Sequence, residues 1–311
     1  MLVIQDAISL GLVWSLMAIG VYLTFRILDM PDLSVEGTVI LGMAMAGRLI
    51  DAGRNPFVAT GAAILVGCAG GFVTGVLHTK FKIPPILAGI LTMVASWSVV
   101  IRILGARPNL PLPPHGARPV VSVYTFLQES AFFQRTFDNP RLAAIIVLTS
   151  VIVVVFGALL YCFLGTEVGS AVRATGNNRQ MVKAQGINTD TMTILCLMIS
   201  NGLVGMTGAL AAQQQGFADV NMGVGTIVVG LASVIIAEVL FRVRSVWARF
   251  ISLVVGSIIY RLIIALALRL DFLEASDFRM LIAIIVAIAL TLPLIREKLA
   301  KFIKKLGRGT R

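Results

Sequence analysis

The sequence predicts an all-α integral membrane protein that forms a single transmembrane domain over residues 1–311. Its composition is 58% hydrophobic and only 13% charged, whereas soluble domains carry about 25% charged residues. Uncharged apolar runs recur along the chain, and most are long enough to cross the roughly 30 Å hydrocarbon core of a bilayer. One polar stretch, residues 165–190, interrupts this pattern. These observations favour about nine membrane crossings and a short polar segment outside the membrane.

Six of the predicted spans contain no charged residue: Ala7–Phe25, Pro56–Leu77, Ile83–Ile101, Leu142–Leu164, Thr191–Ala212 and Val220–Ala237. Three further spans contain or border a charged residue: Val35–Ala46, Phe250–Leu268 and Phe278–Ile295. The second and seventh spans of the nine are short or rich in glycine. We therefore expect these two to be discontinuous helices rather than ordinary continuous ones.

The polar stretch 165–190, which we call the knob, reads as two short helices. Val168–Thr175 and Arg179–Gln185 each suit a helix, and Gly176-Asn177-Asn178 and Gly186 supply residues that end helices and form turns. Because predicted spans flank the knob on both sides, it joins two membrane crossings.

Orientation follows from lysine and arginine, which accumulate in short cytoplasmic loops. The tail 296–311 holds seven of them, so we expect it and the knob to be cytoplasmic. With nine crossings, the N-terminus then lies outside, as does the segment 105–141. That segment is rich in proline early and in aromatic residues later, which predicts an extended start followed by an interfacial amphipathic helix. The net charge of +11 is thus explained by topology rather than by nucleic-acid binding.

An internal repeat relates the two halves. Gly37–Ala44 matches Gly225–Ala232 at an offset of 188 residues, and an aspartate precedes each, Asp32 and Asp219. The same offset carries the first, third and fourth spans onto the sixth, eighth and ninth, which predicts two inverted four-helix repeats around one unpaired span. The predicted organisation is repeat one at about 1–104, an external loop at 105–141, a linking span at 142–164, the coupling segment at 165–190, repeat two at 191–295 and a basic cytoplasmic tail at 296–311.

Polar residues are sparse within the apolar region, and such residues are costly unless they face protein or a water-filled path. The candidates for a translocation path are Asp32, Ser34, Glu36, Gly37, Asn201, Asp219, Asn221 and Gly225. The alternative is that they lie at the interface and merely start helices, with Asp32 and Asp219 as N-caps.

Enzymatic chemistry finds no support in the sequence. The chain contains no Gly-Lys pair, so it lacks the phosphate-binding loop of an ATP site. Its two histidines, His78 and His115, lie outside the predicted spans, and its three cysteines are widely separated, so no metal or catalytic spacing is readable. We expect no cofactor in this chain.

The knob resembles the cytoplasmic coupling segment of permease subunits in the branched-chain amino acid/ribose family of ABC importers. The resemblance rests on Glu167-Val168-Gly169, Ala171-Val172-Arg173-Ala174, Gly176, Asn178 and Gly186-Ile187-Asn188. Three further segments, Asp32–Thr38, Leu87–Met93 and Gly216–Thr226, are similar to the tryptophan/tyrosine permease subgroup. Ala237 stands where that subgroup would have glycine, which puts close helix approach there in doubt.

The resemblance implies a membrane subunit of the bacterial inner membrane that pairs with a second copy of itself, two ATPase subunits and an external substrate-binding protein. The ATPases would bind ATP and Mg²⁺, and movement of the knob would drive alternating access for an amino acid such as tryptophan or tyrosine. The ATPase-coupling residues would be Glu167, Gly169, Arg173, Ala174, Gly176, Asn178, Arg179 and Gly186. The small ones would fit a groove, and Glu167, Arg173 and Arg179 would fix orientation at its rim. The alternative is a secondary transporter driven by an ion gradient, which has no use for an ATPase dock.

Overall fold

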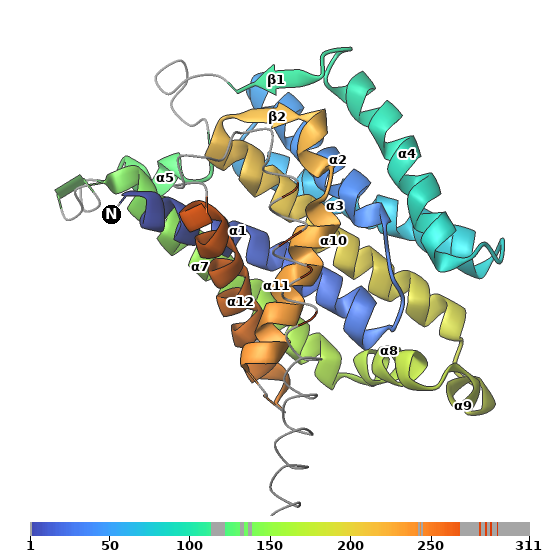
Figure 1. The fold of residues 1–311 in the computed structure, drawn as a ribbon. Coiled ribbons are helices and arrows are strands. Elements are labelled where there is room, and N and C mark those ends of the chain that lie inside the picture. The colour runs from blue at the N-terminus through green and yellow to red at the C-terminus, as the bar shows by residue number, and fades with distance from the viewer. Residues whose placement is uncertain are drawn as a thin grey trace, which may run out of the picture.

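The computed structural model describes residues 2–112, 122–130, 134–135, 139–241, 243 and 245–267, together with the single residues 280, 284, 287 and 291. These residues form an elongated helical bundle with a small strand pair at one end (Figure 1). The elements in chain order are α1 (Leu2–Tyr22), the π-helical turn η1 (Leu23–Ile27), α2 (Ser34–Asp51), α3 (Pro56–Thr79), α4 (Pro85–Ile103), β1 (Asn109–Pro111), α5 (Thr125–Gln128), α7 (Pro140–Gly165), α8 (Glu167–Asn177), α9 (Arg179–Ala184), α10 (Thr189–Gln215), β2 (Phe217–Asp219), the 3-10 turn η2 (Val220–Gly223), α11 (Thr226–Leu240) and α12 (Val246–Ala267).

Seven helical segments of the described residues are long and apolar enough to cross a membrane: Ile4–Ile27, Pro56–Thr79, Pro85–Ile103, Pro140–Gly165, Thr189–Gln215, Val220–Leu240 and Val246–Ala267. They overlap the six charge-free runs and the predicted eighth span. The predicted second span lies in α2, which carries three charged residues and is not among the seven. Almost all of the predicted ninth span, Phe278–Ile295, and the whole tail lie outside the described residues. The count of nine crossings and the inverted repeat therefore stay predictions.

The centre of the bundle is α10, which packs against α3, α2 and α1. Glycines allow these backbones to meet: a Cβ atom at Gly205 would lie 2.5 Å from the carbonyl oxygen of Ala63 on α3, and a Cβ at Gly42 on α2 would overlap the backbone of Gly205. Without water to drive apolar burial, helices in membranes associate through such close packing of small residues. The backbones of α2 and α3 thus meet the backbone of α10 directly.

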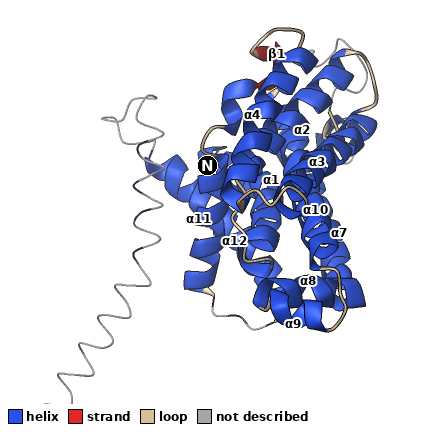
Figure 2. Cartoon of the chain, turned by 90° about the vertical axis from the view of Figure 1, so that its right-hand side faces the viewer, coloured by secondary structure: helices blue, strands red, loops and turns tan. Residues whose placement is uncertain are grey.

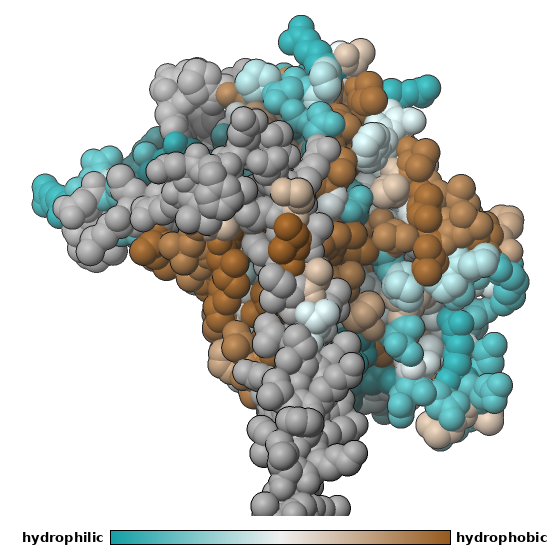
Figure 3. Space-filling view, viewed as in Figure 1, coloured by the Kyte–Doolittle hydropathy of each residue, from teal (hydrophilic) through white to brown (hydrophobic). Residues whose placement is uncertain are grey.

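The outer helices expose apolar side chains at mid-height of the bundle. Val151 and Val154 on α7, and Leu91 and Val94 on α4, are each 45% exposed or more. Figure 3 shows apolar surface across the middle of the molecule, between polar surface near the strand pair and polar surface over the knob. This distribution is what a lipid-facing belt requires.

The end of the bundle opposite the knob carries the two strands. β1 and β2 pair antiparallel, with Asn109 opposite Asp219 and Pro111 opposite Phe217. Figures 1 and 2 place β1 at one end and α8 and α9 at the other. The predicted extended start of the segment 105–141 is confirmed at β1, whereas the pairing with β2 was not predicted. Of the predicted amphipathic helix, residues 131–133 and 136–138 lie outside the described residues, and the described part contains the one-turn helix α5.

The prediction of two discontinuous helices is half confirmed. The seventh span is interrupted: η2 is followed by Val224 and by Gly225 in the left-handed conformation, with φ of 80°, before α11 begins. The second span is a continuous helix, α2, and Gly37 lies in its first turn, so a break at Gly37 is wrong. Gly37 serves packing instead, because a Cβ there would lie 2.8 Å from the Cα of Met93 on α4.

Candidate functional sites: the knob and the buried polar residues

The knob folds as the sequence predicts, as two short helices, α8 and α9. The Thr166 side chain caps α8 by accepting from the Gly169 amide at 3.1 Å, and Asn178 caps α9 by accepting from the Met181 amide at 3.0 Å. Gly186 turns the chain with φ of 81°, and Asn188 caps α10. Each cap satisfies backbone donors that a helix start leaves free. The knob is thus a defined structural unit at the end of the bundle.

One face of the knob packs onto the bundle. A Cβ atom at Gly169 would overlap the Phe163 carbonyl oxygen at the end of α7, and one at Gly176 would overlap the Ile27 carbonyl oxygen of η1. Val172 between them is fully buried. The expectation that these two glycines fit into a groove of a partner is therefore wrong, because both face the chain's own bundle. Their small size allows the knob to pack against α7 and η1.

The opposite face of the knob is open to a partner. Glu167, Arg173, Asn178 and Gly186 are exposed, and Ala174 is half-buried. Two apolar side chains that the sequence analysis did not select also lie in this polar segment, with Val168 41% and Met181 47% exposed. Their apolar character within a polar, turn-rich segment is visible in the sequence, but it does not distinguish them from Val172 and Val182, which are buried.

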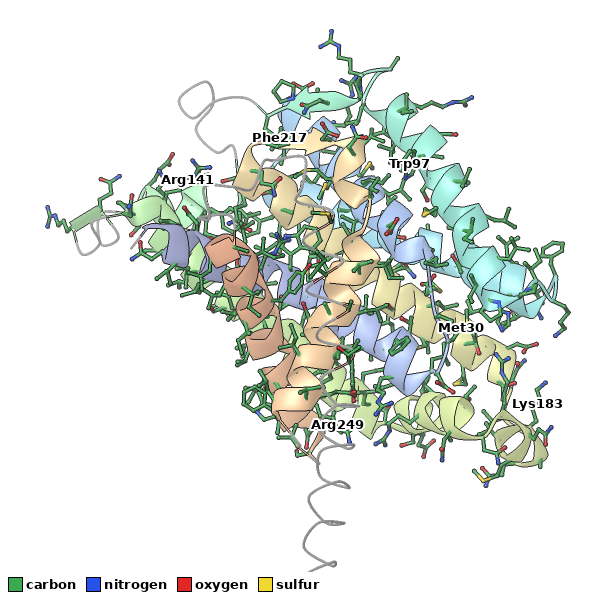
Figure 4. The ribbon with its side chains drawn as sticks, in the orientation of Figure 1. Met30, Trp97, Arg141, Lys183, Phe217 and Arg249 are labelled. Atoms are coloured by element: carbon green, nitrogen blue, oxygen red, sulfur yellow. The ribbon has the colours of Figure 1, made fainter. Side chains whose placement is uncertain are left out.

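Arg179 lies at the junction of knob and bundle rather than at an outer rim. Its Nη2 donates to Oγ1 of Thr193 on α10 at 2.7 Å, and its Nη1 lies 3.5 Å from Nε2 of His78. His78, which the sequence analysis placed outside the spans, is in the last turn of α3. A cavity of about 220 Å³ lies beside them, lined also by Met30 and Pro85. Figure 4 shows Met30 at the knob end of the bundle and Lys183 out on α9.

Asp32, Ser34 and Asn201 form one buried cluster between α2 and α10. The Asn201 amide donates to Oδ2 of Asp32 at 2.8 Å, the Ser34 hydroxyl donates to Oδ1 of Asn201 at 3.2 Å, and the Ser34 amide donates to Oδ1 of Asp32 at 2.9 Å. All three residues are at most 3% exposed, and Asn201 lies near the middle of α10. The cluster satisfies its polar groups internally, as burial requires, and in this conformation it joins two helices instead of lining an open surface.

The remaining candidate path residues lie in other places. Oε1 of Glu36 accepts from the Gly225 amide at 2.9 Å, so a carboxylate lies at the N-terminus of α11, where the helix dipole favours negative charge. Asp219 accepts from the Asn109 side chain at 2.9 Å across the strand pair and from the Asn221 amide at 2.7 Å, and Asn221 is exposed. The eight candidate path residues thus fall into separate groups. The alternative interpretation, in which the aspartate merely starts a helix, holds for Asp219, which caps η2.

Asp32 and Asp219 form the same local turn, since each accepts from the amide two residues later. This agrees with the matched segments that follow them in the sequence. Among the described residues, no group of three or more His, Cys, Asp or Glu side chains could hold a metal ion.

Comparison with known proteins gives a family and several relatives. The family model described as "Branched-chain amino acid transport system / permease component" matches residues 3–291. The chain is 39% identical over 283 residues to the tyrosine transport system permease protein of Clostridioides difficile, covering 91% of this chain and 88% of that protein. It is 28% identical to an uncharacterized protein of Rickettsia prowazekii, covering 93% and 97%, and 25% identical to the autoinducer 2 import system permease protein LsrC of Salmonella typhi, covering 67% and 55%. No solved structure matches.

Proposed function

The chain belongs to the family of branched-chain amino acid transport system permease components, and from this premise we propose that it forms the path of an ATP-driven amino acid importer. Family membership and the seven apolar helices make it a multi-pass membrane transport subunit. The observation that carries the proposal is the knob, a capped pair of short helices with one face packed on the bundle and the other exposed.

The knob is the proposed dock for a partner ATPase. A segment that transmits force needs a firm contact with its own bundle, and Gly169, Val172 and Gly176 provide one. It also needs exposed residues that a partner can contact, and Met181, Glu167 and Arg173 are exposed. Two copies of the chain with two ATPases, which would bind ATP and Mg²⁺, complete the proposed transporter.

The proposed substrate is an aromatic amino acid. Support comes from the relative named as a tyrosine transport system permease, which the chain matches over most of its length. Uptake of labelled tyrosine into vesicles containing the permease, its ATPase and the external binding protein tests this proposal. Excess unlabelled tyrosine or tryptophan should suppress uptake, whereas leucine and ribose should not. Suppression by leucine or ribose alone would assign a different substrate.

The end of the bundle near the strand pair is the proposed dock for the external binding protein. Its exposed cations in the described chain are arginines, among them Arg54, Arg102 and Arg107, whereas the described lysines, Lys80, Lys82 and Lys183, lie at the knob end. Arginine is enriched in protein interfaces and lysine is depleted. An arginine-bearing surface on the outside also departs from the usual placement of positive charge in cytoplasmic loops. It supports an external partner with an acidic surface.

The proposed orientation in the inner membrane is tested by single cysteines. Asn109 lies in β1 and Asn177 ends α8, and both side chains are exposed. In a background without the three native cysteines, a cysteine at position 109 should react in intact cells with an impermeant thiol reagent. A cysteine at position 177 should react only after the cells are opened. Labelling of position 177 in intact cells would reverse the orientation.

A further inference from the structure

Arg179 makes a directed contact with α10 at the base of the knob. Its Nη2 donates to Oγ1 of Thr193 at 2.7 Å, while the Thr193 hydroxyl donates its own proton to the Thr189 carbonyl at 2.9 Å. The hydroxyl proton is therefore committed within the helix, and an oxygen lone pair remains for the guanidinium. A hydrogen bond to a charged donor is stronger than one between neutral groups. The contact fixes the first residue of α9 to the N-terminal part of α10.

His78 offers the same guanidinium a second acceptor. Nδ1 of His78 lies 2.9 Å from the Ile83 carbonyl oxygen. A carbonyl oxygen only accepts, so Nδ1 carries the proton and Nε2 of the neutral ring has a lone pair. Nε2 lies 3.5 Å from Nη1 of Arg179, which makes this the longer of the two contacts. One side chain of the knob thus reaches both α3 and α10.

A half-open pocket lies beside Arg179 where the knob meets the bundle. The cavity of about 220 Å³ beside it is lined by Asp29, Met30, Pro85 and Thr175 together with His78 and Arg179. The other contacts of the knob with the bundle include those of the buried apolar residues Val172 and Val182, and dispersion contacts of this kind have no preferred direction. Arg179 by contrast makes a directed hydrogen bond and lines this pocket.

We propose that Arg179 is a positioning residue that adds a directed route to the packed contact of Gly169, Val172 and Gly176, and that movement of the knob reaches α10 and α3 through its contacts with Thr193 and His78. The transmission step rests on the proposed function, since it presumes an ATPase that moves the knob. Thr193 and Asn201 are eight residues apart on α10, about 12 Å at the helical rise of 1.5 Å per residue. A displacement applied at Thr193 therefore travels along one helix to the buried cluster of Asp32, Ser34 and Asn201.

Two substitutions of Thr193 separate this role from general packing. Thr193→Val keeps the shape of the side chain but removes the acceptor, whereas Thr193→Ser keeps the hydroxyl and removes a methyl group. In the reconstituted importer, Thr193→Val should still bind the ATPase but transport about tenfold less substrate per ATP hydrolysed, the factor that corresponds to about 1.4 kcal/mol. Thr193→Ser should remain within about twofold of the wild type, less than about 0.5 kcal/mol on the same scale.

A second measurement uses the purified full chain in detergent without partners. Spin labels are attached to single cysteines that replace Phe81, two residues after the end of α3, and Gln185, just after α9, both exposed. Thr193→Val should broaden the distribution of distances between them, and Thr193→Ser should not. If Thr193→Val does not fold, Arg179→Met, which keeps the apolar stem and loses every donor, is expected to give the same two results.

Two results would overturn the proposal: an unchanged distance distribution in Thr193→Val, or equal impairment of Thr193→Ser and Thr193→Val. Loss of ATPase binding in Thr193→Val would also overturn it, because the site would then serve docking rather than transmission. If the wild-type system moves substrate without ATP, the proposed function fails, whereas the distances in the isolated chain still decide whether Arg179 fixes the knob to the bundle.

Discussion

Replacing Gly205 with leucine is expected to abolish accumulation of folded protein. A Cβ atom at this position would lie 2.5 Å from the Ala63 carbonyl oxygen and 3.1 Å from the Cα of Gly67, both on α3. On the other side, the Gly205 backbone meets Gly42 of α2. Because the obstacles are backbone atoms, a rotamer change cannot relieve the overlap, and α10 must separate from its neighbours. Overpacking at one core site typically costs about 1–3 kcal/mol where side chains can yield, and we expect a larger cost here.

The variants are produced as fluorescent fusions, extracted in detergent and run on a size-exclusion column. The measurement is the amount of protein in the monodisperse peak. Gly61→Leu is the matched control, since Gly61 lies on α3, is exposed and has no atom within 4 Å of a Cβ built there. It should accumulate at the wild-type level. Equal yields of the two variants would mean that α3 and α10 do not pack as closely as the structure has them.

Replacing Met181 with aspartate is expected to abolish binding of the partner ATPase. Met181 lies on α9 of the knob and is 47% exposed. Because Met181 is already about half-buried, burying the rest of its side chain contributes about half of the roughly 1.5–3 kcal/mol of a full burial. An unpaired carboxylate in the same place adds a desolvation penalty of about 1–3 kcal/mol. Together these predict a loss of about a hundredfold or more in affinity, at 1.4 kcal/mol per tenfold.

Co-purification of the ATPase with the tagged permease measures this effect. Gln5→Glu adds the same charge at an exposed position near the start of α1, away from the knob, and should leave co-purification intact. Arg173→Ala, which removes an exposed charge, should weaken binding only modestly and in a salt-dependent way. Wild-type co-purification in Met181→Asp would show that the exposed face of the knob is not the dock.

The sequence predicted best what is local. Asn178 caps α9 and Gly186 turns the chain through chemistry that involves only neighbouring residues, so the two knob helices could be located in advance. The packing of Gly176 against the bundle could not be predicted in the same way, because the residue it contacts, Ile27, is far away in the chain. The pairing of Asn109 with Asp219 was missed for the same reason, and strands of three residues show no readable alternation.

The buried polar residues were found one at a time but not as a cluster. Asp32, Ser34 and Asn201 each stand out as polar residues in apolar surroundings, whereas their mutual hydrogen bonds depend on how α2 meets α10. Glycine patterns were ambiguous for a physical reason. Gly225 adopts a left-handed conformation that interrupts its span, while Gly37 provides close contact with α4 inside a continuous helix. The same residue type meets both requirements, so the sequence alone could not separate them.

The most direct test of the proposed function is the energy source of transport. The permease is reconstituted into vesicles with its ATPase and with ATP in the compartment that faces the knob, and the binding protein with labelled tyrosine is added on the other side. Uptake should require both ATP and the ATPase, and it should persist when ionophores collapse the sodium and proton gradients. Uptake by the permease alone, driven by an ion gradient and lost with ionophores, would contradict the importer and assign a secondary transporter.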